Sequence, residues 1–150
     1  MRSKLVWLVI PVLSLLIVMS LAGQERPNFQ GAWTSPEHSG VSLTTTQDEF
    51  RVTEAGPLGQ NTLVYRLDGS DSRNETKTVR GETWVHVSRS QWVSSALVIT
   101  ITTTRENGAS WSWMKIYTMD KGMLKITTVD AVLENAIDMA VRTVSYSPQN

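Results

Sequence analysis

From residue 29 onward, almost every segment of this chain alternates apolar residues with Thr, Ser or charged residues at a period of two. In segment 97–104, for example, Leu97, Ile99 and Ile101 share one parity, and threonines occupy the other. Successive side chains of a strand point to opposite faces of its sheet, so this period is typical of half-buried β-strands. A sheet with one apolar face must close on itself or pack against a second layer.

The alternation predicts about eight to ten strands, with little helix. Turn pairs that tolerate positive φ separate several of them, and gaps this short favour antiparallel hairpins over parallel crossovers. The predicted turns are Gln47-Asp48, Asp68-Gly69, Asn107-Gly108 and Lys121-Gly122. The predicted strands are 29–33, 41–46, 49–54, 62–67, 75–80, 83–88, 97–104, 110–119, 124–129 and 141–146. The expected fold is an all-β, antiparallel up-and-down meander closed into a barrel, with a sandwich as the alternative.

One segment departs from this period. Between Asp130 and Ala140, apolar residues recur at a helical spacing that includes Val132, Leu133 and Ala136. The spacing predicts a short helix before the last strand. The alternative is a strand-loop-strand continuation with its turn at 134–135.

The first 22 residues have the pattern of a secretory signal peptide. Arg2 and Lys4 precede an uncharged apolar run, 5–22, that ends in small residues. An uncleaved anchor is the alternative, because the run reaches the lower limit of a spanning helix, but Pro11 within it favours cleavage. We therefore expect a single exported domain over 23–150, periplasmic or extracellular, with no stable membrane span after cleavage.

Composition excludes several classes of partner. The chain carries 14 basic and 14 acidic residues, and without Arg2 and Lys4 of the leader the balance is slightly acidic. No nucleic-acid partner is therefore expected. The chain has no Cys, so no disulfide can stabilise an exported domain and the core alone must do so.

No motif in the chain predicts catalysis. The two histidines, His38 and His86, lie far apart without ligand spacing, so we expect loop or surface-strand positions and no metal or other cofactor. No serine lies in a nucleophile elbow. Asp48, Glu54 and Glu82 are the acids that a glycosidase pair would use, but nothing in the sequence pairs them. The sequence thus predicts a protein that is not an enzyme.

Aromatic residues are the strongest candidates for a binding site. Trp111, Trp113 and Tyr117 share one parity of a single segment, with Lys115 and Met119 on the same face. One interpretation is an aromatic-lined pocket with a cation for an acidic head group. The simpler interpretations are a core stripe, or an exterior apolar patch with Lys115 in solvent. The candidate ligand-binding residues are Tyr65, Trp84, Trp92, Trp111, Trp113 and Lys115.

Five short motifs carry a family resemblance. They are Phe29-Gln30-Gly31-Ala32-Trp33, Ser42-Leu43-Thr44-Thr45-Thr46-Gln47, Tyr65-Arg66-Leu67-Asp68-Gly69, Leu97-Val98-Ile99-Thr100 and Val144-Ser145-Tyr146. With these, the chain resembles the uncharacterised secreted lipocalin-like β-barrel proteins of bacteria. The resemblance implies that Trp33 packs under the barrel floor against an Arg of the last strand, which here is Arg142, with Gly31 allowing close backbone passage.

Two hypotheses for function follow. The first is a non-enzymatic exported barrel that binds a small apolar or amphipathic ligand in its interior or mouth. The alternative is a structural or protein-interaction module of the cell envelope that uses an outer β-face or a sheet edge. A hydrolase is a third possibility that no motif favours.

Overall fold

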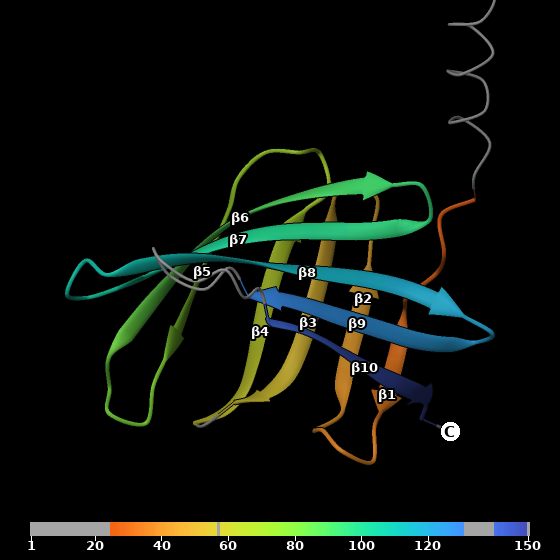
Figure 1. Ribbon diagram of the computed structural model, residues 1–150, viewed down its shortest axis with the longest axis horizontal. Coiled ribbons are helices and arrows are strands. Elements are labelled where there is room, and N and C mark those ends of the chain that lie inside the picture. Colours follow the sequence, from red (N-terminus) through yellow and green to blue (C-terminus); the bar gives the residue numbers. More distant parts are fainter. Residues whose placement is uncertain (1–24, 57, 131–139, 150) are drawn as a thin grey trace, which may run out of the picture.

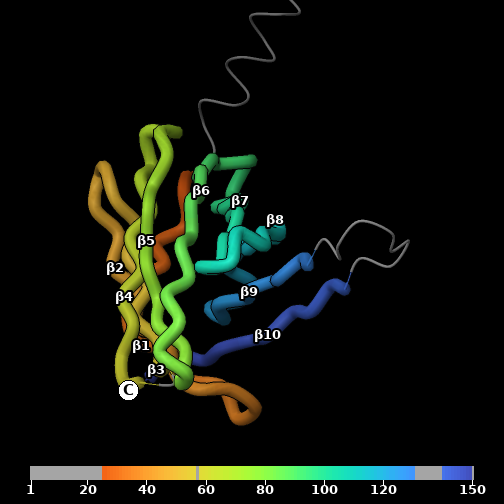
Figure 2. Tube along the Cα trace, turned by 90° about the vertical axis from the view of Figure 1, so that its left-hand side faces the viewer, coloured from red at the N-terminus to blue at the C-terminus, as the bar shows by residue number. Residues whose placement is uncertain are grey.

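Ten antiparallel strands form a single sheet that curls into a nearly closed barrel (Figures 1 and 2). The computed structural model describes residues 25–56, 58–130 and 140–149. The strands are β1 (Gly31–Thr34), β2 (Val41–Thr45), β3 (Glu49–Gly56), β4 (Gly59–Arg66), β5 (Ser72–Lys77), β6 (Thr83–Val93), β7 (Ala96–Arg105), β8 (Ser110–Asp120), β9 (Met123–Asp130) and β10 (Ala140–Pro148). Their order in the sheet is β4-β3-β2-β1-β10-β9-β8-β7-β6-β5. This confirms the predicted all-β meander and its closure.

The hairpin turns explain where the predicted strand boundaries are right and where they are wrong. Gly69, Gly108 and Gly122 all have positive φ, as their turns require. The β6–β7 hairpin instead turns on Ser94-Ser95, where Ser94 has a φ of 55°. Without a glycine, this turn gave no signal, so β6 was predicted to end at residue 88 although it continues to Val93. The strand β5 spans 72–77, whereas the predicted range, 75–80, lay three residues further along the chain.

Two predictions fall wholly or mostly on segments that the structure does not describe. The signal peptide, 1–22, lies outside the described residues. So does 131–139, the body of the predicted helix, whereas Asp130 and Ala140 at its ends are paired strand residues. No helix within the described part of the chain is long and apolar enough to cross a membrane.

Aromatic side chains fill one part of the barrel interior. Phe29, which precedes β1, is fully buried and packs against Phe50, Trp92 and Tyr117 at ring-centroid distances of 6.0, 5.8 and 6.3 Å. Phe50 lies edge-on to Tyr117 at 4.9 Å. Phe50, Trp92 and Tyr117 share the inner parity of their strands with the apolar residues around them. This half of the interior is therefore a packed core.

The Gly31–Trp33 segment joins the two halves of the sheet. β1 pairs with β2 on one side and with β10 on the other. Trp33 is buried, and its indole N–H donates a hydrogen bond of 3.0 Å to the carbonyl of Phe29. Gly31 has a φ of 142°, a conformation that other residues rarely adopt, although a Cβ there would meet only the Trp33 indole at an ordinary 3.7 Å. Backbone conformation, and not crowding, thus accounts for the glycine.

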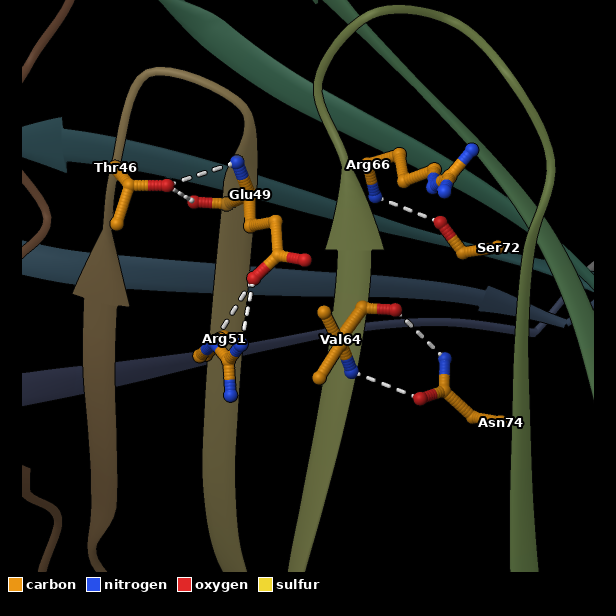
Figure 3. A network of polar contacts seen from close by, with 7 residues as sticks. All are labelled: Thr46, Glu49, Arg51, Val64, Arg66, Ser72 and Asn74. Carbon is orange, nitrogen blue, oxygen red and sulfur yellow. Dashed lines mark hydrogen bonds and ion pairs between the residues drawn. The ribbon is translucent and has the colours of Figure 1, made fainter.

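Side chains complete the barrel where the two ends of the sheet meet. β4 and β5 run side by side without a backbone ladder (Figure 2). Instead, the Asn74 amide accepts a hydrogen bond of 2.8 Å from the Val64 N–H and donates one of 2.9 Å to the Val64 carbonyl (Figure 3). The Ser72 hydroxyl accepts a bond of 2.6 Å from the Arg66 N–H. We call this junction, formed by Ser72 and Asn74 on β5 with Val64 and Arg66 on β4, the seam.

Trp33→Ala should lower the free energy of unfolding by about 3–5 kcal/mol, because it removes a buried indole from the junction between the two halves of the sheet. Trp33→Phe retains a ring and loses mainly the hydrogen bond to Phe29, so its loss should be clearly smaller. Urea denaturation followed by circular dichroism measures both. Equal stability of Trp33→Ala and the wild type would contradict this role.

Asn74→Ala should lower the free energy of unfolding by about 2 kcal/mol, because the partly buried N–H and carbonyl of Val64 both lose their partner. Glu75→Ala, at the exposed neighbouring position, is the matched control and should change stability by less than about 0.5 kcal/mol. Chemical denaturation of the two variants decides the matter. A similar small effect for both would show that the seam contributes little.

Candidate functional site

The larger cleft of the barrel opens where the seam ends. Asn74 lies opposite Val64, so continuing the antiparallel alignment puts Thr76 opposite Thr62. The Thr76 hydroxyl does not reach across to β4 but makes a hydrogen bond of 2.8 Å with Nε2 of His86. The strands enclose a cleft of about 390 Å³ here. Its walls combine aromatic and aliphatic side chains (Leu63, Tyr65, Trp84, Ile101 and Trp113) with polar ones (Glu54, Asn61, Thr76, Lys77 and His86).

A chain of hydrogen bonds fixes one wall of this cleft. The Trp113 indole N–H donates to the Thr103 hydroxyl at 2.8 Å, and that hydroxyl lies 2.9 Å from Nδ1 of His86. Thr103 is completely buried. Because its oxygen already accepts from Trp113, its proton is best placed on Nδ1, which assigns the remaining imidazole proton to Nε2 and directs it to Thr76. A neutral His86 thus satisfies every member of the chain.

An ion pair separates this cleft from a second, more polar one. Nζ of Lys115 lies 3.6 Å from a carboxylate oxygen of Glu54, and the Lys115 side chain is only 13% exposed. The same ammonium lies 5.5 Å from the ring centre of Trp113. The second cleft has a volume of about 250 Å³ and is lined by Glu54 and Lys115 together with His38, Thr128, Arg142 and Tyr146. Glu54 therefore belongs to both clefts.

Burial and the Glu54 charge shift the titration of the groups around them. Burial lowers the pKa of His86, the positive charge of Lys115 lowers it further, and Glu54 acts in the opposite direction. Burial also raises the pKa of Tyr65 and of Tyr117 well above its usual value, and Glu54 adds to both shifts. All three side chains are therefore neutral near pH 7.

The structure brings together some of the predicted ligand-binding residues and separates others. Tyr65, Trp84 and Trp113 line the larger cleft, and Lys115 lines the second. Trp111 packs edge-on against Trp84 at 5.3 Å, outside the lining of either cleft. Trp92 lies in the aromatic core, stacked on Phe29.

The guanidinium of Arg105 covers this aromatic pair, at 5.1 Å from the ring centre of Trp84 and 5.2 Å from that of Trp111. Lys115 faces inward and is not in solvent, which rules out the exterior-patch interpretation of this segment. Trp113, Lys115 and Tyr117 instead form an inner face that is partly core and partly cleft wall.

Of the residues proposed for closure, Gly31 and Trp33 lie in the opening strand described above. Arg142 lies at the edge of the second cleft, paired with Thr128 of β9. Among the described residues, the cation–π contacts involve other tryptophans, including Trp92 beneath Arg26 at 5.2 Å.

Sequence reasoning missed three residues of the site and of the seam. Glu54 has the parity of the buried Phe50 and Val52, so alternation along β3 could have placed its carboxylate inside. His86 has the parity of Trp84. Its assignment to a surface-strand position is wrong, because its ring is half-buried and faces the cleft. Asn74 gave no signal beyond an Asn-x-Thr sequence that matches a glycosylation acceptor.

Comparison with known proteins adds no relative: the chain matches no protein-family model, and no curated protein is similar enough to it to count as a match. The class must therefore be stated from the structure. The chain forms a nearly closed, ten-stranded antiparallel β-barrel with a filled aromatic half and two clefts that share Glu54, the partner of Lys115 in an ion pair.

The stability of the protein should fall more steeply below pH 6.5 than that of a His86→Gln variant. The pKa of His86 is lower in the folded than in the unfolded chain, so the unfolded chain takes up the proton first as the pH falls. The contribution of neutral His86 to the free energy of unfolding is therefore fully present above about pH 6.5 and is lost as the pH falls below that value. Urea denaturation at pH 7 and pH 5 measures the difference, and parallel pH profiles of the two proteins would contradict the assignment.

Proposed function

We propose that this protein is a non-enzymatic carrier or sensor that binds a small amphipathic molecule in the larger cleft. The observation that carries the proposal is the composition of that cleft. Tyr65, Trp84 and Trp113 supply apolar surface, and Glu54 and His86 supply polar groups. Ligand sites are typically concave, mostly apolar and equipped with a few placed polar groups, and volumes of about 300–1,000 Å³ are usual.

The packing of the barrel limits where the ligand can lie. Phe29, Phe50 and Tyr117 occupy the interior of the aromatic half, and each is fully buried. A long molecule therefore cannot thread through the barrel. The ligand lies at the mouth, with its apolar part against Trp84 and Trp113.

The polar groups define how a ligand would be oriented. His86 is held by Thr76 and Thr103, and Glu54 is held near Lys115. These groups need no rearrangement before binding, which lowers the entropic cost of ordering the site. A ligand with one polar group and one compact apolar group matches both kinds of side chain in the cleft wall.

The cellular setting is also part of the proposal. The apolar leader over 1–22 supports an exported domain, periplasmic or extracellular. The nearly closed barrel and the Phe29–Trp33 motif support membership of the secreted lipocalin-like group. Barrels of about eight strands commonly hold one small ligand.

Trp84→Leu should weaken the binding of amphipathic probes by about five- to tenfold, because aromatic anchors in such sites commonly contribute more than 1 kcal/mol. The probes are decanoate and 4-phenylbutan-1-ol, and isothermal titration calorimetry measures their affinities. Trp92→Leu is the matched control: it removes an indole that lies in the aromatic core, so affinity should stay unchanged while stability falls. If the wild type bound neither probe, the proposed function would be wrong.

A further inference from the structure

Glu54 is the acidic side chain that faces the larger cleft. It has the inner parity of β3, and its carboxylate pairs with the ammonium of Lys115, a residue of the second cleft. That contact, at 3.6 Å, is longer than a hydrogen bond. A carboxylate has two oxygens and accepts from several donors. Glu54 therefore retains capacity for a second positively charged partner in the larger cleft, whose lining does not include Lys115.

The tryptophans of the larger cleft bind cations within the protein itself. The Lys115 ammonium lies 5.5 Å from the ring centre of Trp113, and the Arg105 guanidinium lies 5.1 Å from that of Trp84. The face of an indole attracts cations because its quadrupole is negative there. Tyr65 adds a third ring to the same lining. Aromatic rings gathered around one cavity are an arrangement that recognises organic ammonium groups.

The ion pair of Glu54 and Lys115 gives the cleft walls different electrostatic character. At Tyr65, on β4, burial raises the pKa and the Glu54 charge raises it further. At His86, on β6, burial lowers the pKa, and the Lys115 charge then lowers it more than Glu54 raises it. The wall around Tyr65 thus favours a positive group, and the wall around His86 does not. Lys77, the other cation of the lining, is exposed, so water and salt screen its charge.

The Tyr65 hydroxyl is a second polar group at the favourable wall. Tyr65 is only 2% exposed and lines the cleft. Its hydroxyl takes part in none of the side-chain hydrogen bonds among the described residues, and a neutral hydroxyl can accept from an N–H donor. Leaving a buried polar group without a partner is unfavourable. A donor on the ligand would therefore gain a hydrogen bond here.

We infer that the larger cleft selects a small primary amine, which Glu54 and Tyr65 bind as its ammonium ion, with the apolar group of the amine against the tryptophans of the wall. The inference rests on the proposed function, because it names the charge of the ligand for the same cleft. A primary amine is protonated at pH 7, as a lysine side chain is. An acid of the same shape would meet the Glu54 carboxylate, and an alcohol would gain a hydrogen bond without the ionic attraction.

Three probes with the same phenylbutyl group test the selectivity. They are 4-phenylbutylamine, 4-phenylbutan-1-ol and 4-phenylbutanoate, and isothermal titration calorimetry at pH 7 and low salt gives their affinities. The wild type should bind the amine about tenfold more tightly than the alcohol, since hydrogen bonds to charged groups are the stronger ones. The acid should bind more weakly than the alcohol. Added salt should reduce the advantage of the amine.

Variants of three charged residues test the role of Glu54. Glu54→Gln keeps the shape of the side chain without its charge, so the ratio of amine to alcohol affinity should fall from about ten to about one. Glu49→Gln is the matched control, because it removes an acid of the same strand at the opposite parity, and the ratio should stay unchanged. Lys115→Met removes the competing cation and should tighten binding of the amine. Near-ultraviolet circular dichroism shows whether each variant is folded, and Lys115→Met gives a second test if Glu54→Gln is not.

The outcomes separate this inference from the proposed function. Equal affinities of the wild type for the amine and the alcohol, or tighter binding of the acid than of the amine, would overturn the inference and leave the proposed function standing. A ratio that stayed near ten in folded Glu54→Gln, or weaker binding of the amine by Lys115→Met, would also overturn it. Binding of none of the three probes would contradict the proposed function, and the inference with it.

Discussion

The bidentate contact between the Asn74 amide and the backbone of Val64 determines how this sheet ends. A curled sheet of ten strands has two edges, and each presents a row of backbone N–H and carbonyl groups that need partners. Here the edges meet without a ladder, and a side-chain amide takes the place of the missing peptide group. The Ser72 hydroxyl repeats this for one more N–H. The contact holds β4 and β5 together where the two edges of the sheet meet.

This kind of closure has a consequence that a backbone ladder would not have. Ladder hydrogen bonds continue for as long as both strands run together, whereas side-chain bonds occur only where a residue of suitable length and chemistry stands. Asn74 reaches β4, but the shorter Thr76 bonds to His86. The strands can therefore separate beyond Asn74 while the barrel stays closed beside it. The larger cleft results from this change of partner.

Much of the fold could be predicted from the sequence because the alternation of polar and apolar residues is a local signal. Leu97, Ile99 and Ile101 showed the inner face of β7 directly, and Gly108 and Gly122 marked two of the hairpins. The Ser94-Ser95 turn could not be found in this way, because its positive φ falls on a serine. The seam could not be predicted either, since Asn74 and Val64 meet only after eight other strands have determined the curvature.

The candidate site was predicted in part, for a related physical reason. Tyr65, Trp84 and Trp113 were recognised as large inner-face side chains, and they do line one cleft. Trp92 has the same chemistry and the same parity but lies in the aromatic core. Parity gives the face of a sheet on which a residue lies, but its height within the barrel depends on the stagger between strands. The sequence could therefore identify inner residues without dividing them between core and cleft.

The division of the interior also indicates which half is maintained for stability and which for binding. The aromatic half, around Phe29 and Phe50, buries mainly apolar surface, and its two polar atoms, the Tyr117 hydroxyl and the Trp92 indole N–H, have no hydrogen-bond partner among the described residues. In the other half, Glu54, Lys115 and His86 are partly withdrawn from water, which is unfavourable for charged and polar groups even when they are paired. Apolar residues at these positions would pack as well with less desolvation. Proteins commonly depart from the most stable arrangement at functional sites, and in this barrel the departures gather around one residue, Glu54, where the two clefts meet.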